Sequence, residues 1–266
     1  MNDIWNWQYW HNLPYLTCHL LGQWQHGFFT QQFSPQPPAE IAAVWGQEIS
    51  VYRVQQVHGD RILTPSEIEQ TELLPEQNYP PADGLISENA NQSVWVASAD
   101  CTPALIGDVV SGRVAAVHAG WRGTAKSIVP KTIVRFLQFG SVLENLRVAM
   151  GPAIAGEVYQ VTESVAAEVG RSLFDLDPVN AEIKTNEDII SALKASDNSP
   201  LFDDPEPERI RLDVRCVNQL QLQQLGLKPE QIAIAPFCTF QQSDKFFSYR
   251  RTQEKKVQWS GIVSTE

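Results

Sequence analysis

The feature that most constrains the fold is a set of three short apolar runs that follow one another between residues 94 and 118. The runs at 94–99, 102–107 and 113–118 are bounded by turn residues and are too short for helices, so they are predicted as strands. Similar runs at 49–56 and 146–151 predict two more strands. Because strands here follow strands as well as helices, the pattern favours an α+β fold over a repeating βαβ unit.

Three helices are predicted after these strands. Thr124 can cap a helix that runs toward Phe139, although Pro130 requires a kink or a start one turn later. A second helix is expected at 162–174. In the third, Asp213 is the expected N-cap and Gly226 the end. The buried stripe of this third helix is expected to consist of Val217, Leu220 and Leu225.

The 266 residues, of which 43% are hydrophobic, are predicted to form a single domain at 1–266, because neither an internal repeat nor a break in composition divides them. Five of the eight Trp precede Asp60, which indicates a well-packed N-terminal region. The acidic, proline-containing stretch 175–209 is expected to be a surface insertion with one short helix around 188–194. Loops are expected at 34–38 and 75–81.

The charge of the chain limits its partners. A formal net charge of -11 disfavours nucleic acid and anionic membrane surfaces as partners. Neither a long apolar run nor a basic leader followed by an apolar block is present, so we expect no membrane span and no secretory signal. The four Cys are far apart in sequence, which is atypical of a disulfide scaffold and favours a reducing cytoplasm. We expect a monomer or a weak homo-oligomer.

Three potential metal ligands fall at or near the ends of apolar runs: His58, Cys101 and His118. Imidazole and thiolate are natural zinc ligands, and three of them with one exchangeable position are typical of a catalytic site. Each residue alone is also compatible with a structural role, and the spacings of 43 and 17 residues (101−58 and 118−101) are not diagnostic. The residues therefore leave the choice between an open metal site and ordinary packing undecided.

Two further segments could bind a ligand. Gly120 and Gly123 allow close backbone approach at a predicted helix start, and Arg122 offers a planar donor for an anion. Near the C-terminus, Phe247 and Tyr249 could stack a planar base, and Arg250 could hold an anion. A solvated Arg in a turn and an aromatic strand in the core are the structural alternatives.

Together these motifs resemble the YfiH family, also called the multicopper-oxidase-like or laccase-domain family. The resemblance covers nearly the whole chain, and the HAGWRG block at 118–123 is its most specific part. The matching segments are 26–30 (HGFFT), 56–59 (QVHG), 82–84 (ADG), 99–103 (ADCTP), 118–124 (HAGWRGT), 151–154 (GPAI) and 246–251 (FFSYRR).

The resemblance implies a single α+β domain of layered mixed sheets flanked by helices, with zinc bound at His58, Cys101 and His118. It implies a purine nucleoside phosphorylase that cleaves adenosine, inosine, guanosine and methylthioadenosine with phosphate. Adenosine deamination is a further activity of the family, and copper-dependent polyphenol oxidation has been attached to relatives. With Arg250, the three ligands are the expected catalytic residues. The residues expected at the substrate or phosphate are Arg122, Phe247, Tyr249 and Gln31.

The chain departs from the family pattern in three places. Gln31 stands where relatives usually have Arg, which puts phosphate binding at that position in doubt. The turn at 155–157 lacks the Cys that relatives often have, and 257–259 replaces a common Gly-Arg pair.

Other functions remain open on the residues. A metal-free cysteine hydrolase would use Cys101 as nucleophile and His118 as base, with Asp83 or Asp100 orienting the base. A non-catalytic protein that binds metal or nucleoside would keep the fold and lose phosphate binding at Gln31. A copper-dependent oxidase would bind copper at the same three ligands.

Overall fold

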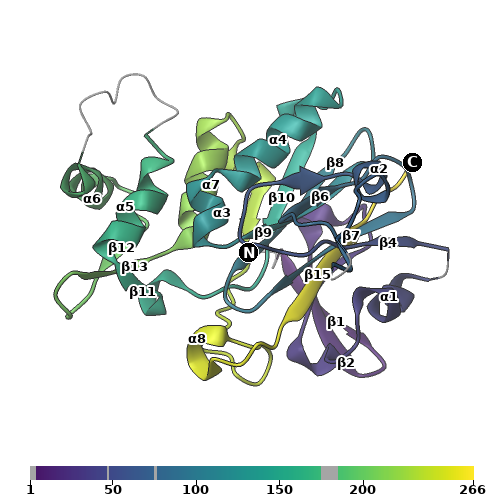
Figure 1. The fold of residues 1–266 in the computed structure, drawn as a ribbon, viewed down its shortest axis with the longest axis horizontal. Helices are drawn as coiled ribbons and strands as arrows, with labels where there is room; N and C mark the ends of the chain where they lie inside the picture. Colours follow the sequence, from purple (N-terminus) through teal and green to yellow (C-terminus); the bar gives the residue numbers. More distant parts are fainter. Residues whose placement is uncertain (1–3, 47, 75–76, 175–184) are drawn as a thin grey trace.

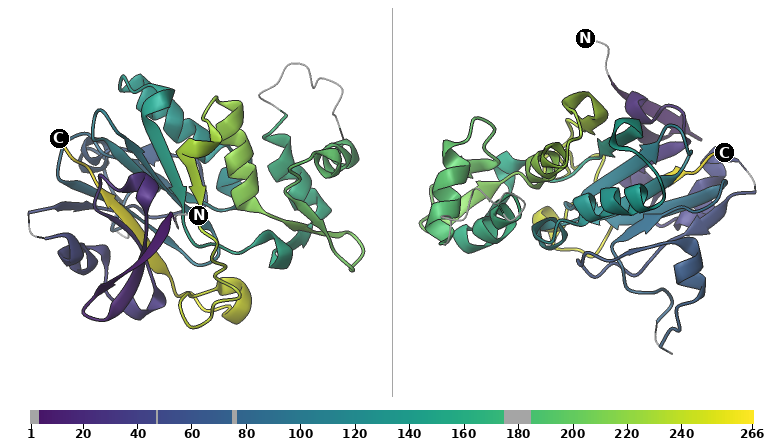
Figure 2. Two further views of the ribbon diagram at one scale, coloured as in Figure 1. Left: turned by 180° about the vertical axis from the view of Figure 1, so that it is seen from behind. Right: turned by 90° about the horizontal axis from the view of Figure 1, so that it is seen from above.

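A computed structural model describes residues 4–46, 48–74, 77–174 and 185–266 of the chain. Two six-stranded mixed sheets pack face to face, and a three-stranded sheet lies at one end of the molecule (Figures 1 and 2). The first sheet has the order β1 (Trp5–Trp10), β2 (Leu13–Cys18), β3 (His26–Phe29), β15 (Gln258–Val263), β7 (Gln92–Ser98) and β4 (Ser50–Tyr52). The second has the order β14 (Ile232–Ile234), β10 (Leu146–Met150), β8 (Thr102–Asp108), β9 (Val114–Ala119), β6 (Gly84–Ile86) and β5 (Ile62–Leu63).

Helices cover the outer faces of this sandwich and pack against one side of the third sheet (Figure 1). The third sheet has the order β11 (Gln160–Thr162), β13 (Arg209–Leu212) and β12 (Leu201–Asp203). The helices are α1 (Pro38–Ile41), α2 (Pro65–Glu69), α3 (Trp121–Ala125), α4 (Ile128–Gln138), α5 (Glu163–Arg171), α6 (Asn186–Ala195), α7 (Val214–Gln224) and α8 (Tyr249–Thr252). None of the helices in the described ranges is long and apolar enough to cross a membrane.

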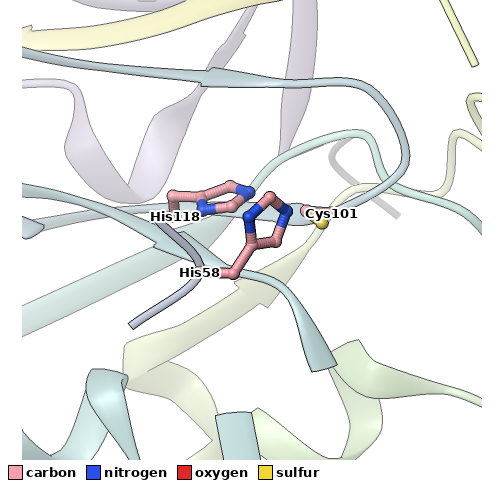
Figure 3. A group of neighbouring side chains, drawn as sticks. All are labelled: His58, Cys101 and His118. Atoms are coloured by element: carbon pink, nitrogen blue, oxygen red, sulfur yellow. The ribbon is translucent and has the colours of Figure 1, made fainter. Parts of the chain in front are cut away.

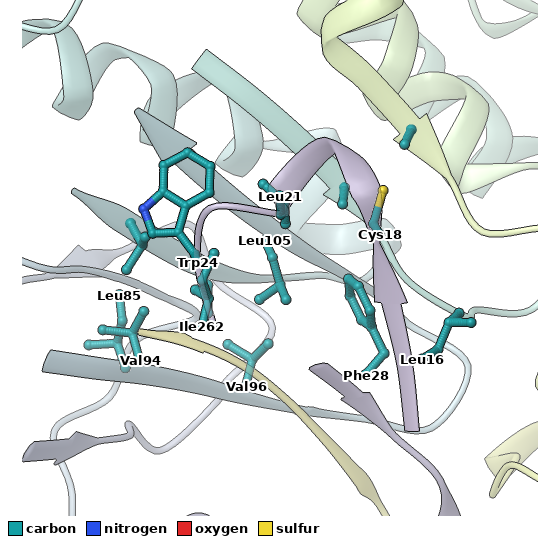
Figure 4. Packing of buried hydrophobic residues seen from close by; sticks show 14 of the residues in the cluster. Leu16, Cys18, Leu21, Trp24, Phe28, Leu85, Val94, Val96, Leu105 and Ile262 are labelled. Carbon is teal, nitrogen blue, oxygen red and sulfur yellow. The ribbon is translucent and has the colours of Figure 1, made fainter. Parts of the chain in front are cut away.

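The second sheet is buried on both faces because its strands alternate two sets of apolar side chains. Leu105 and Ala116 face the first sheet, in a core shared with Phe28 (Figure 4). Their neighbours Ile106 and Val117 face the opposite way, toward a core to which α4 and α7 contribute. This double burial explains why the runs at 102–107 and 113–118 are apolar throughout rather than alternating.

The mixed α+β architecture predicted from the sequence is confirmed. Three of the predicted strands match β7, β8 and β9 to within two residues at each end, and the run at 146–151 is β10. The run predicted at 49–56 is much shorter, since β4 ends at Tyr52. The N-terminal region is well packed as expected, because Trp5 and Trp24 are buried and Trp45 is partly buried.

The predicted cap at Thr124 is wrong, and the alternative start one turn later is confirmed, because the helix that runs toward Phe139 begins at Ile128. Thr124 lies inside α3, where its side chain is buried and its hydroxyl accepts a hydrogen bond from Asn218 Nδ2 at 3.0 Å. The helical backbone is interrupted at Ser127, which has a left-handed φ of 57°. Helix α4 begins after it and contains Pro130 in its first turn. Proline is tolerated there because first-turn N–H groups have no partner within the helix.

The other two helix predictions are confirmed at their N-caps. Thr162 accepts from the backbone N–H of Val165 at the start of α5. Asp213 accepts from the N–H groups of Arg215 and Cys216 at the start of α7.

Part of the predicted acidic insertion lies outside the described residues, namely 175–184. In the described remainder, the short helix expected around 188–194 is present as α6, which is capped by Thr185. Ile189 and Leu193 of α6 are buried in a cluster that also contains Val169 of α5 and Ile210 of β13. The described part of the acidic stretch therefore contributes apolar side chains to a core that it shares with α5 and β13.

Candidate metal centre

His58, Cys101 and His118 come together from three separate parts of the fold (Figure 3). Their candidate ligand atoms all lie within 4.8 Å of one another. His58 is in the loop after β4, Cys101 in the turn between β7 and β8, and His118 in β9. The structure thus brings together the three residues that the sequence singled out.

Asp83, immediately before β6, holds two of these residues in place. Its fully buried carboxylate accepts a hydrogen bond from His118 Nδ1 at 2.8 Å, which leaves Nε2 of that ring for a ligand. The same carboxylate accepts from the backbone N–H groups of Val57, His58 and Gly59 at 3.1, 2.9 and 2.7 Å. These bonds stabilise the loop in which His58 has a left-handed φ of 57°.

Gly120 provides the space beside the three ligands. A Cβ at this position would lie 2.8 Å from Cys101 Sγ and 3.3 Å from His58 Cδ2. Any larger residue would therefore occupy the volume between the two candidate ligands. The φ of Gly120, -70°, suits any residue, so its backbone conformation does not require glycine. Glycine is required because Cys101 and His58 lie so close to it.

The charges of the group favour a thiolate beside an imidazolium. Burial alone would raise the pKa of Cys101, but the charge and hydrogen bonding of His118 outweigh it and lower the pKa to about 6. Burial would lower the pKa of His118, but the Cys101 thiolate and Asp83 raise it to about 9. Cys101 is thus a ready anionic ligand near neutral pH.

The donor set fits zinc. One thiolate and two imidazoles match the ligand types of catalytic zinc sites, in which a fourth position stays open. His58 is exposed and Cys101 half-buried, whereas His118 is buried, so the group is accessible from one side. The donor types also suit copper, so they do not by themselves select one metal.

Asp100 links the metal group to the C-terminal segment. Its carboxylate accepts from Thr239 Oγ1 and from the backbone N–H of Arg250, both at 2.7 Å. Because Asp100 directly precedes Cys101 in the chain, these bonds hold the first turn of α8 beside the turn that contains Cys101. Of the two aspartates considered for orienting His118, Asp83 contacts that ring, and Asp100 is engaged by Thr239 and Arg250.

Tyr159 is a member of the site that the sequence gave no reason to select. It lines a small pocket of about 30 Å³ together with Cys101 and Trp121. Burial, and next the Cys101 thiolate, raise the pKa of Tyr159 to about 12, and the nearby Arg250 and Arg122 act in the opposite direction. Its ring lies 4.8 Å from the guanidinium carbon of Arg250. Only the folded chain reveals this position, because no motif surrounds Tyr159.

Apart from Gln31, the remaining predicted site residues lie at the start of α3 and on or just before α8. Arg250 is exposed and donates from Nη1 to the carbonyl of Gln160 at 2.8 Å. Arg122 is exposed at the start of α3, 4.2 Å from the ring of Trp121. Tyr249 is exposed on α8, and Phe247 is partly buried.

The side chain and the backbone of Gln31 both donate hydrogen bonds to the segment that precedes α8. Its side-chain amide donates to the carbonyl of Ser243, and its backbone N–H donates to the carbonyl of Lys245, both at 2.9 Å. Its described contacts are therefore with a neighbouring loop, and none of them is with the three ligands.

Comparison with known proteins gives consistent results. The family described as multi-copper polyphenol oxidoreductase laccase matches residues 38–264. The chain is 56% identical over 263 residues to a purine nucleoside phosphorylase of Synechocystis sp., covering 99% of this chain and 98% of that protein. An adenosine deaminase from an unknown prokaryotic organism is 25% identical over 169 residues, 64% of this chain and 56% of the relative. The crystal structure of YlmD from Geobacillus stearothermophilus has the same fold, with a TM-score of 0.78, 22% identity and coverage of 99% of this chain and 100% of that one.

Proposed function

Since the chain belongs to the multi-copper polyphenol oxidoreductase laccase family, we propose that it is a zinc-dependent purine nucleoside phosphorylase. Its substrates would be adenosine, inosine, guanosine and methylthioadenosine, each with phosphate. The observation that carries the proposal is the similarity to the Synechocystis phosphorylase over almost the full length of both chains. The position of Arg250 supports it, because Asp100 holds the backbone of this cation next to Cys101.

The proposed reaction is a displacement at the ribose. An oxygen of phosphate forms a bond to C1′, and the bond from C1′ to the purine nitrogen breaks. The purine departs with the electron pair and takes up a proton, which leaves ribose 1-phosphate. The enzyme must hold the anion near C1′ and stabilise the charge that develops on the departing base.

The residues of the site suit these tasks. Arg250 and Arg122 are the proposed phosphate-binding side chains, since charge-assisted donors are needed to hold an anion in a chain of net charge -11. Phe247 and Tyr249 are proposed to wall the base. His58, Cys101 and His118 would hold the zinc ion, which would supply Lewis-acid polarisation of the substrate. Gln31 lacks the charge of the Arg usual in relatives, so we expect weak phosphate affinity at that position.

Adenosine deamination is proposed as a secondary activity. Its support is the similarity to a protein named adenosine deaminase. That similarity is lower and shorter than the similarity to the phosphorylase, so we place deamination second.

The proposal is tested with purified zinc-loaded protein and adenosine or inosine, by following free base, ribose 1-phosphate and ammonia separately. We expect base release to require phosphate and to match ribose 1-phosphate formation. Arg250→Gln should raise the phosphate KM, and Lys194→Gln, an equal charge change on distant α6, should leave it unchanged.

Each alternative predicts a different result in the same assay. Base release that ignores phosphate would indicate a hydrolase, and activity that persists in metal-free protein would favour Cys101 as a nucleophile. Absence of release under every condition would favour a binding protein. Oxidation of phenols by copper-loaded protein alone would favour the oxidase.

A further inference from the structure

A pocket of about 290 Å³ lies apart from the three candidate ligands, none of which lines it. Its walls come from Thr30 and residues 33–37, from Arg53 just after β4, and from residues 255–259 before and at the start of β15. The described lining carries three cationic side chains, Arg53, Lys255 and Lys256, and no carboxylate. Such a concentration of positive charge is unexpected in a chain of net charge -11.

Arg53 is positioned by two aromatic rings. Its guanidinium carbon lies 4.3 Å from the ring centre of Tyr79 and 4.8 Å from that of Trp259. Stacking of this kind holds a guanidinium by its faces and leaves the N–H groups at its edge for a ligand. Within the described ranges Arg53 has no hydrogen bond or ion pair, and its Nε is buried without a partner.

The pocket also offers a hydrogen-bond acceptor at Gln36 and cationic side chains at Lys255 and Lys256. Gln36 also lines the pocket, and its side-chain oxygen is buried without a partner among the described residues, so it lacks a donor. Lys255 has no partner in the part of the chain that the structure describes. Lys256 pairs with Glu254 at 3.0 Å, but both side chains are more than half exposed, so this pair is weak.

We propose that this pocket binds a small phosphomonoester that carries hydroxyl groups, such as a sugar phosphate. A phosphate dianion matches a lining with three cationic side chains better than a single carboxylate does, and the planar edge of Arg53 suits its oxygens. A ligand hydroxyl would donate to the oxygen of Gln36. The volume is at the lower end of that of small-molecule sites and exceeds what inorganic phosphate alone needs. The proposal concerns binding alone and does not depend on the proposed phosphorolysis.

Isothermal titration of the full chain with ribose 5-phosphate and with inorganic phosphate, without nucleoside, tests the proposal. We expect one ribose 5-phosphate per chain, bound more tightly than inorganic phosphate. The double variant Lys255→Gln/Lys256→Gln should weaken it by about tenfold or more, since two charged donors are lost. Arg53→Lys should also weaken it, because the charge stays but the planar edge is lost.

Control variants separate this pocket from the metal centre. Lys194→Gln makes the same kind of charge change on α6, and Arg250→Gln changes the proposed catalytic site; both should leave ribose 5-phosphate binding within about twofold of the original chain. Equal affinity for both probes would show that the anion alone is recognised and would overturn the sugar phosphate as ligand. Absence of saturable binding, or loss of binding in Arg250→Gln but not in the Lys double variant, would overturn the pocket itself. Neither result would bear on nucleoside cleavage, which the activity assay measures separately.

Discussion

At the scale of the residue, Cys101 is the side chain on which metal binding should depend most. Cys101→Ala removes the thiolate and leaves two imidazoles, so we expect tight zinc binding to be lost. Protein purified without added metal should contain roughly one zinc per chain before the change and almost none after it. Metal analysis by mass spectrometry measures this content.

The other three cysteines provide the controls. Cys18 and Cys238 are buried and Cys216 is partly buried, and none belongs to the metal group. Cys18→Ala, Cys216→Ala and Cys238→Ala should therefore retain their zinc. Unchanged zinc content in Cys101→Ala would refute the assignment.

Asp83 should matter almost as much as the ligands, although it is not one of them. Asp83→Asn removes the charge that orients His118 and weakens the acceptor shared by the loop of His58. Loss of such a supporting group typically lowers metal affinity by about 10–100-fold. Titration against a chelator of known affinity measures the change, with exposed Asp197→Asn as control. An affinity within about twofold of the original would contradict this role.

The pH dependence of zinc affinity follows from the same group of charges. The raised pKa of His118, about 9, means that its ring must lose a proton before it can bind metal at neutral pH. Cys101, whose pKa is lowered to about 6, is already a thiolate there. Affinity should therefore rise with pH between about 7 and about 9, by about tenfold per unit, with release of about one proton. Titrations in buffers of different ionisation enthalpy count that proton, and an affinity independent of pH in this window would contradict the assignment.

At the scale of the element, the start of α7 combines a helix cap with an ion pair. Asp213 caps the helix and also binds the largely buried guanidinium of Arg215, at 2.8 Å. Asp213→Ala would remove both interactions and leave Arg215 without its carboxylate. The expected loss of stability is about 2–4 kcal/mol, between the cost of a cap and that of breaking a fully buried pair.

Urea unfolding of Asp213→Ala measures this loss, and Asp213→Asn separates its two parts. Asn keeps an oxygen for the cap but lacks the charge, so it should fall between the original chain and the Ala variant. Turnover per folded molecule should stay nearly unchanged in both. A large loss of turnover in fully folded protein would show that Asp213 has a role in the reaction.

Elements with a strong local signal could be predicted from the sequence. The apolar runs of β7, β8 and β9 and the caps Thr162 and Asp213 are encoded by adjacent residues. Other features depend on distant partners: Thr124 is buried against Asn218, so its capping ability goes unused. The three candidate ligands could be predicted because each lies at or near the end of an apolar run, whereas Tyr159 joins Cys101 in one pocket only in the folded chain.

At the scale of the whole molecule, the net charge should affect how phosphate is used. Most of the acidic groups act on phosphate from a distance, and added salt screens such distant repulsion. The proposed contacts between phosphate and Arg250 would be short, and salt would weaken them much less. The phosphate KM should therefore fall when NaCl is raised from about 10 mM to about 150 mM, while the KM of uncharged inosine stays nearly constant. Initial rates at fixed inosine test this, and a rising phosphate KM would show that local positive charge dominates.

The place of β15 in the first sheet affects how the protein can form during synthesis. This strand, Gln258–Val263, pairs with β3 on one side and with β7 on the other. The centre of the sheet is thus completed by a strand that is synthesised after every other strand of that sheet. Until they emerge, the facing edges of β3 and β7 lack their partner, and such edges are prone to pair with other chains. A chain released before Gln258 would therefore be a substrate for chaperones and proteases rather than a shortened enzyme.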